Sequence, residues 1–127
     1  MAGTIFLTGA NTGIGIRTTK LFLSNGWQVA ATSRASSDRS RLRELETEYP
    51  TTLFVTDLDL FDADTIQPAL DAAIQKFSRI DILINNAGFG QYGPIELVTI
   101  ENVQKQFEAN VYGQLSVATW PQDRSQC

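Results

Sequence analysis

The chain has 127 residues, 43% of them hydrophobic and 19% charged, with a formal net charge of −4 at pH 7. These values fit one globular domain with its own core and disfavour a nucleic-acid surface, which needs a basic stripe. The apolar runs are too short to cross a membrane, and the first residues lack the basic and apolar regions of a signal peptide. We therefore expect a cytoplasmic protein with no nucleic-acid partner and no transmembrane segment.

The cysteine and histidine contents exclude two kinds of site. The single cysteine is Cys127, so an intrachain disulfide cannot form, and a reducing compartment fits. The chain has no histidine, which excludes histidine bases and histidine metal ligands, and one cysteine cannot build a zinc site. We expect no metal centre.

Short apolar segments predict strands at residues 4–8, 27–32, 53–55 and 81–84. Each lacks strict alternation of apolar and polar residues, as expected for strands that are buried on both faces. Helical patterns over residues 13–25, 38–49 and 64–77 lie between these strands, and a fourth helical pattern begins after Thr99. Strands that alternate with amphipathic helices predict an α/β fold, a doubly wound parallel sheet with helices on both faces.

The helices are indicated by their apolar positions and caps. We expect Asp38 and Thr99 to act as N-caps, and Asn25-Gly26 to end the first helix. The apolar positions are, in chain order, Ile14, Leu21 and Phe22; Leu42, Leu45 and Tyr49; Ile66, Leu70, Ile74 and Phe77; and Ile100, Val103, Phe107, Val111 and Leu115.

The loop after the first strand is rich in glycine. The stretch "TGANTGIG" places Gly9, Gly13 and Gly15 where a strand passes into a helix. Backbone N–H groups and a helix N-terminus at such a loop can bind the phosphates of a nucleotide, although a glycine turn without a ligand is the alternative. No lysine follows these glycines, so the loop is not a P-loop, and its spacing is not G-x-G-x-x-G.

Four motifs occur in order along the chain. They are "TGANTGIG", "DLD" at residues 57–59, "NNAG" at residues 85–88 and "NVYG" at residues 110–113. Together they resemble the short-chain dehydrogenase/reductase family over residues 3 to 118. The resemblance implies a Rossmann-type sheet with strand order 3-2-1-4, incomplete because the family's later strands do not follow, so that the fourth strand forms a bare apolar edge. The extended sugar-epimerase branch has a G-x-x-G-x-x-G loop, which this spacing does not fit.

The resemblance also implies a nicotinamide cofactor and its site. Asp57 would hydrogen-bond the adenine, while Asn86 and its neighbours would line the ribose or stabilise the central strand. The complete set of expected cofactor-binding residues is Gly9, Asn11, Thr12, Gly13, Ile14, Gly15, Ser33, Arg34, Asp57, Leu58, Asn86, Ala87 and Gly88.

The residues after the second strand favour NADP(H) over NAD. An acidic residue at this position binds the ribose 2′-hydroxyl of NAD, whereas an arginine accommodates the 2′-phosphate of NADP. Ser33 and Arg34 occupy this position, and both can donate hydrogen bonds to a phosphate. The alternative is that Arg34 is one more solvated charge, with Asp38 as the acidic residue. Asp38, however, is four residues too late and suits a helix cap.

Only one catalytic residue of the family has a counterpart, the helix asparagine at Asn110, for which a bulge-forming structural role is the alternative. The family's tyrosine has a lysine four residues later, but Tyr49, Tyr92 and Tyr112 are followed at that spacing by leucine, glutamate and serine. By lineage we expect an NADP(H)-dependent oxidoreductase that interconverts a small carbonyl and alcohol. The alternatives are a nucleotide-binding or regulatory fragment that pairs with itself or with a full-length relative, and an unstable product without function.

The last residues depart from the family pattern. Pro121 should end the last helix, and nothing after it matches what the family has next. We therefore expect a shortened nucleotide-binding domain over residues 1–119 and a polar tail over residues 120–127. The stretch "NNAGFGQYGPIE" is also similar to a subgroup that acts on retinoids, hydroxysteroids and acyl-dihydroxyacetone phosphate.

Overall fold

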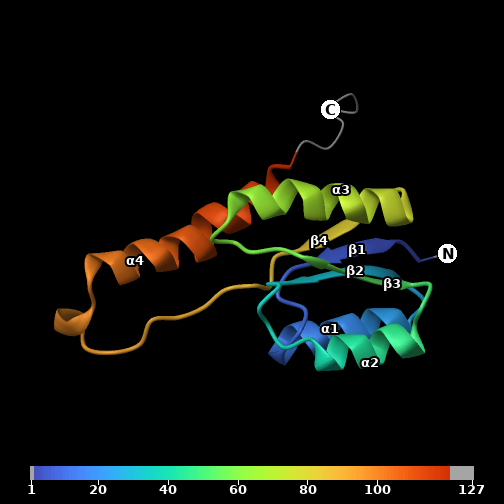
Figure 1. The fold of residues 1–127 in the computed structure, drawn as a ribbon, viewed down its shortest axis with the longest axis horizontal. Coiled ribbons are helices and arrows are strands. Elements are labelled where there is room, and N and C mark those ends of the chain that lie inside the picture. The colour runs from blue at the N-terminus through green and yellow to red at the C-terminus, as the bar shows by residue number, and fades with distance from the viewer. Residues whose placement is uncertain (1, 121–127) are drawn as a thin grey trace.

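One parallel sheet organises residues 2–120, the part of the chain that the computed structural model describes (Figure 1). Its strands are β1 (Thr4–Leu7), β2 (Gln28–Ser33), β3 (Leu53–Asp57) and β4 (Ile82–Ile84), in the order β3-β2-β1-β4. All three neighbouring pairs are parallel. The predicted α/β class and strand order are confirmed, and β4 lies at an edge of the sheet.

Helices cover both faces of the sheet. The helices α1 (Gly13–Ser24) and α2 (Ser40–Glu48) lie on one face. The other face carries α3 (Ile66–Phe77), which follows the short 3₁₀ turn η1 (Ala63–Thr65). The chain then leaves β4 through a long connection that contains the 3₁₀ turn η2 (Ile95–Leu97). It returns through α4 (Ile100–Phe107), the π-helix η3 (Glu108–Gly113) and α5 (Gln114–Ala118).

The two central strands, β1 and β2, are buried on both faces, which explains why they do not alternate in polarity. On the α3 side, Phe6 and Ala30 form a core cluster with residues from α3, η3 and α5. On the opposite side, Ile5 and Leu7 pack with residues from α1 and α2. Trp120, the first residue of the expected tail, packs against the α3-side cluster. The remainder of that tail, residues 121–127, lies outside the described residues.

The predicted apolar face of α1 is wrong at two of its three positions, since Phe22 packs against the core but Ile14 and Leu21 do not. Ile14 and Leu21 are 75% and 61% exposed, whereas Gly15, Ile16, Thr19 and Leu23 are the buried positions. The Thr19 hydroxyl donates to the Gly15 carbonyl at 2.9 Å, which satisfies its polar group inside the core. Small residues let α1 approach the sheet closely, so its buried face is not its most apolar one.

The expected N-cap of α2 is wrong by one position. Arg39 is the N-cap, and the Asp38 carboxylate instead accepts a hydrogen bond from the backbone N–H of Ser40 at 2.9 Å. This bond lowers the pKa of Asp38 from its ordinary value. The predicted cap of α4 is confirmed, because the Thr99 hydroxyl accepts from the N–H of Asn102 at 3.2 Å.

The apolar residues that indicate the last helix are exposed rather than buried: Ile100, Val103, Phe107, Val111 and Leu115. Its buried positions are Ala109, Gly113 and Val117, all of which lie in or beyond η3. Among the described residues, no helix is both long and apolar enough to span a membrane.

Candidate functional site

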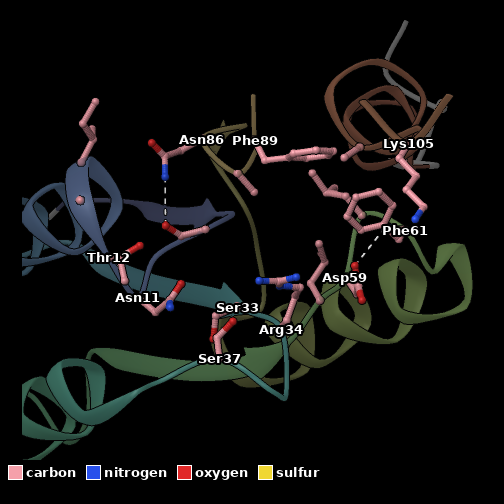
Figure 2. Close-up of a pocket in the computed structure, with 18 residues that line it drawn as sticks. Asn11, Thr12, Ser33, Arg34, Ser37, Asp59, Phe61, Asn86, Phe89 and Lys105 are labelled. Atoms are coloured by element: carbon pink, nitrogen blue, oxygen red, sulfur yellow. Dashed lines mark hydrogen bonds between the residues drawn. The ribbon is translucent and has the colours of Figure 1, made fainter. Parts of the chain in front are cut away.

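A cavity of about 670 Å³ opens at the carboxyl ends of the strands (Figure 2). Open parallel sheets bind ligands at this edge, and the volume falls within the range of small-molecule sites. The cavity is lined by eleven of the predicted cofactor residues, namely Gly9, Asn11, Thr12, Gly13, Ile14, Ser33, Arg34, Leu58, Asn86, Ala87 and Gly88. Gly15, Asp57 and Asn110 are not among the lining residues.

The glycines of the first loop allow close backbone packing. Gly9 has φ +64°, and a Cβ added there would lie 2.8 Å from the Cα of Ala87. A Cβ at Gly15 would lie only 2.0 Å from the Gly9 carbonyl oxygen. Gly15 therefore lies beneath the loop and supports it, while the backbone of Gly13 faces open space. A bulky side chain at either packed position would force the loop to move.

The first turn of α1 has free hydrogen-bond donors at the cavity. Thr12 is the N-cap but makes no side-chain capping bond, and the first turn carries no acidic residue. The first N–H groups of a helix have no partner within the helix, and together with the helix dipole they attract an anion. The Asn11 side chain donates to the Asp38 carbonyl at 3.1 Å and fixes the loop to the connection after β2.

Thr8 joins the loops that follow β1 and β4. Its hydroxyl oxygen accepts from the backbone N–H groups of Asn86 and Ala87, each at 3.0 Å. In return the Asn86 side-chain amide donates to the carbonyls of Thr8 and Gly9, at 3.1 and 3.0 Å. The structure thus gives Asn86 a bracing contact at the cavity wall. Thr8 is the first residue of the motif "TGANTGIG", but the sequence does not indicate that its hydroxyl joins two loops.

Ser33 is the last residue of β2, directly before Arg34, and is fixed by Arg39. Arg39 Nε donates to the Ser33 hydroxyl at 2.7 Å, and Arg39 Nη2 donates to the Ser33 carbonyl at 2.7 Å and to Asp57 Oδ1 at 2.5 Å. Arg34 is exposed, and its side chain extends into the cavity between Ser33 and Asp59 (Figure 2). Within residues 2–120 Arg34 forms no ion pair.

The far end of the cavity is aromatic. The rings of Phe61 and Phe89 are 5.5 Å apart at 47°, and Lys105 of α4 lies beside them (Figure 2). Asp59 supports this wall, since its carboxylate accepts from the Phe61 N–H at 3.0 Å. Phe61, Phe89 and Lys105 come from two separate loops and a helix, so no single motif in the sequence predicts that they meet.

Asn110 holds the loop after β4 rather than lining the cavity. Its side-chain oxygen accepts from the Phe89 N–H at 3.1 Å, and its amide donates to the Phe89 carbonyl at 2.6 Å. Gln106 and Gln114, one turn to either side, contact the same loop at the N–H of Gln91 and the carbonyl of Ala87. We call Gln106, Asn110 and Gln114 the amide ladder. Asn110 also lies within the π-helix η3, in keeping with the structural alternative for this residue.

Comparison with known sequences gives consistent matches. The family model described as short chain dehydrogenase matches residues 3–120. The serine 3-dehydrogenase of Agrobacterium fabrum is 35% identical over 118 residues, which are 92% of this chain and 46% of that protein. The NADPH-dependent 3-dehydrocapnine reductase of Ornithobacterium rhinotracheale is 33% identical, over 84% of this chain and 37% of that protein. The chain thus spans less than half the length of these relatives.

Solved structures share the same arrangement. A short-chain dehydrogenase from Streptomyces avermitilis superposes with a TM-score of 0.84 at 28% identity, over 92% of this chain and 43% of that one. The NADPH-bound carbonyl reductase from chicken fatty liver gives a TM-score of 0.84 at 25% identity, over 92% of this chain and 46% of that one.

Proposed function

This chain belongs to the short-chain dehydrogenase family, and we propose that its cavity is the adenosine and phosphate part of an NADP(H) site. The reaction would be the interconversion of a small carbonyl compound and its alcohol, for which the nicotinamide supplies or accepts the hydride. Because the chain covers 46% of the serine 3-dehydrogenase that it matches, this activity is a proposal for the whole protein.

Three groups of residues would hold the cofactor. The free N–H groups at the start of α1, near Gly13 and Ile14, suit its diphosphate. Leu58, with the bracing loop at Asn86, would line the adenosine. The tight packing at Gly9 and Gly15 suits diphosphate binding, because it holds the glycine loop close to the sheet while the space beside Gly13 stays open. We also propose that Asn110 acts by positioning the loop after β4, through its two hydrogen bonds to Phe89.

The single observation that carries the choice of NADP(H) is the pair Ser33 and Arg34 at the end of β2. Both residues line the cavity, where Arg34 offers a forked cation and Ser33 a hydroxyl. An enzyme selective for NAD would place a carboxylate here to bind the ribose 2′-hydroxyl. The names of two similar proteins, one NADPH-dependent and one NADPH-bound, support the same choice.

A titration tests this proposal. Purified protein is mixed with NADPH or NADH, and the nucleotide fluorescence is followed. We expect NADPH to bind at least about tenfold more tightly than NADH, a difference of about 1.4 kcal/mol. Arg34→Ala should abolish this preference, whereas Arg41→Ala, an equal loss of charge on the exposed side of α2, should keep it. Tighter binding of NADH would contradict the proposal.

A second candidate is a nucleotide-binding module without turnover. It is favoured by one observation, that no tyrosine in these 127 residues has a lysine four positions later. Loss of NADPH absorbance in the presence of a carbonyl compound separates the two candidates. Sustained turnover by verified protein would exclude the second one, whereas binding without turnover would support it. For either candidate we propose a cytoplasmic location and self-association or pairing with a longer relative.

A further inference from the structure

We propose that Arg39 is a positioning residue that sets the preference of this site for a 2′-phosphorylated nucleotide. The inference rests on the proposed NADP(H) function and extends it, because Arg39 is not among the residues that line the cavity. Its effect would act through two neighbours, Ser33 and Asp57.

The contacts of Arg39 are specific. Its guanidinium bonds the hydroxyl and the carbonyl of Ser33 and the carboxylate of Asp57, all at 2.5–2.7 Å. Its side chain is 19% exposed, against 59% for Asp57, so the arginine is the more enclosed partner. Ser33 and Asp57 are themselves register partners at the ends of β2 and β3. Arg39 thus joins two strand ends from one side.

The first consequence concerns charge. Asp57 lies beside Ser33 on the neighbouring strand, where an unpaired negative charge would repel a phosphate dianion. The ion pair with Arg39 offsets this charge. The positive charge of Arg34 then remains available to a ligand, because Arg34 forms no ion pair within the described residues.

The second consequence concerns the direction of a hydrogen bond. A serine hydroxyl has one donor and two acceptor positions. Because the Ser33 oxygen already accepts from Arg39 Nε, its own proton remains free to donate. A phosphate oxygen needs such a donor, whereas a ribose hydroxyl is served as well by an acceptor. Arg39 therefore presents Ser33 to the cavity in the form that suits a phosphate.

Neighbouring arginines do not share these contacts. Arg41 and Arg43 are exposed on α2, and neither forms an ion pair within residues 2–120. A lysine at position 39 would keep the charge beside Asp57 but lacks the planar fork that reaches Ser33 and Asp57 together. These differences supply both the control and the conservative variant for a test.

The test measures NADPH and NADH affinity by fluorescence titration of the full chain. Arg39→Gln should weaken NADPH binding about tenfold and NADH binding less than about threefold, which lowers the ratio of the two. The double variant Arg39→Gln/Asp57→Asn should recover most of that ratio, because the unpaired carboxylate is gone. Arg41→Gln should leave both affinities unchanged.

The outcomes are distinct. The role of Arg39 would be overturned if Arg39→Gln left the ratio of NADPH to NADH affinity unchanged. It would also be overturned if the double variant did not recover that ratio. Neither result would contradict NADP(H) binding by the unaltered chain. Failure of the unaltered chain to prefer NADPH would instead overturn the proposed function and this inference with it. If Arg39→Gln does not fold at the assay temperature, Arg39→Lys takes its place. That variant should lose about threefold in NADPH affinity with NADH unchanged, and equal losses would overturn the role.

Discussion

The central strands of the sheet and its β4 edge are held in place in different ways. Every residue of β1 and all but the first of β2 are buried, and α1, α2 and α3 each bury a face against them. In β4, by contrast, Ile82 is exposed, and α4 has no buried residue at all. There the loop after β4 is fixed by polar contacts from the amide ladder.

This difference shows which forces define each part of the cavity. The loops after β1 and β2 begin at strands that are buried among hydrophobic residues, and such burial is insensitive to single exposed substitutions. The wall formed by the loop after β4 depends on a few hydrogen bonds, each worth about 0.5–1.5 kcal/mol. Substitutions in the two regions should therefore differ in how much they change stability and in how far the effect spreads.

The largest effect should come from the central strand. Phe6 is 0% exposed, so Phe6→Ala should lower the free energy of unfolding by about 3–5 kcal/mol. Phe107→Ala removes the same atoms from a side chain that is 53% exposed, and should cost less than about 1 kcal/mol. Urea denaturation followed by circular dichroism measures both. Comparable losses would contradict the contrast between the central strands and the β4 edge.

A smaller effect should follow from crowding the glycine loop. Gly15→Ala places a methyl group 2.0 Å from the Gly9 carbonyl, and the displaced backbone should cost about 2–3 kcal/mol. Gly13→Ala meets no atom within 4 Å but has φ +55°, so it should cost only about 1–2 kcal/mol. The matched measurement is again urea denaturation. A Gly13 variant that is the less stable of the two would contradict the packing role of Gly15.

The amide ladder should give a local effect. Asn110→Ala removes both hydrogen bonds to Phe89, so protection of the Phe89 amide from hydrogen exchange should fall about tenfold. Protection at Ala30 in β2 should not change. Gln104→Ala, an exposed amide on the same helix, serves as the control. Uniform loss of protection across the sheet would show that Asn110 stabilises the whole domain and not this wall alone.

The smallest effect should appear only in acid. The pKa of Asp81 is lowered from its ordinary value of 3.8, first by the hydrogen bond from the Thr4 N–H and then by Arg79. A depressed pKa stabilises the fold above pH 3.8, and this contribution is lost as pH falls through the lower folded value. Asp81→Asn should therefore flatten the fall in urea midpoint below about pH 4. Asp71→Asn, with the same change of formal charge, should leave that fall in place.

The buried central strands are the part of the fold that is easy to predict from the sequence. Strands buried on both faces are visible as short apolar runs, and Ser33 is the last residue of one such strand. The buried face of α1 was not predictable in the same way, since Gly15 and Thr19 are chosen for size and local bonding rather than for apolar character.

Contacts between loops that are distant along the chain could not be predicted from the sequence either. Arg39 resembles any connector arginine until the parallel register brings Ser33 and Asp57 together. Gln106 and Gln114 look like ordinary polar helix residues, and only the path of the loop after β4 gives them partners. The aromatic wall of Phe61 and Phe89 requires the same long-range information.

The bonds between Thr8 and the loop after β4 also have a consequence for folding kinetics. They join positions 78 and 79 residues apart, whereas the β1–β2 and β2–β3 pairs connect residues only about 24 apart. Contacts across a long intervening chain form slowly, because the entropy of closing that loop must be overcome first. Nucleotide binding should therefore be recovered late in refolding, after the three-stranded part of the sheet has already formed.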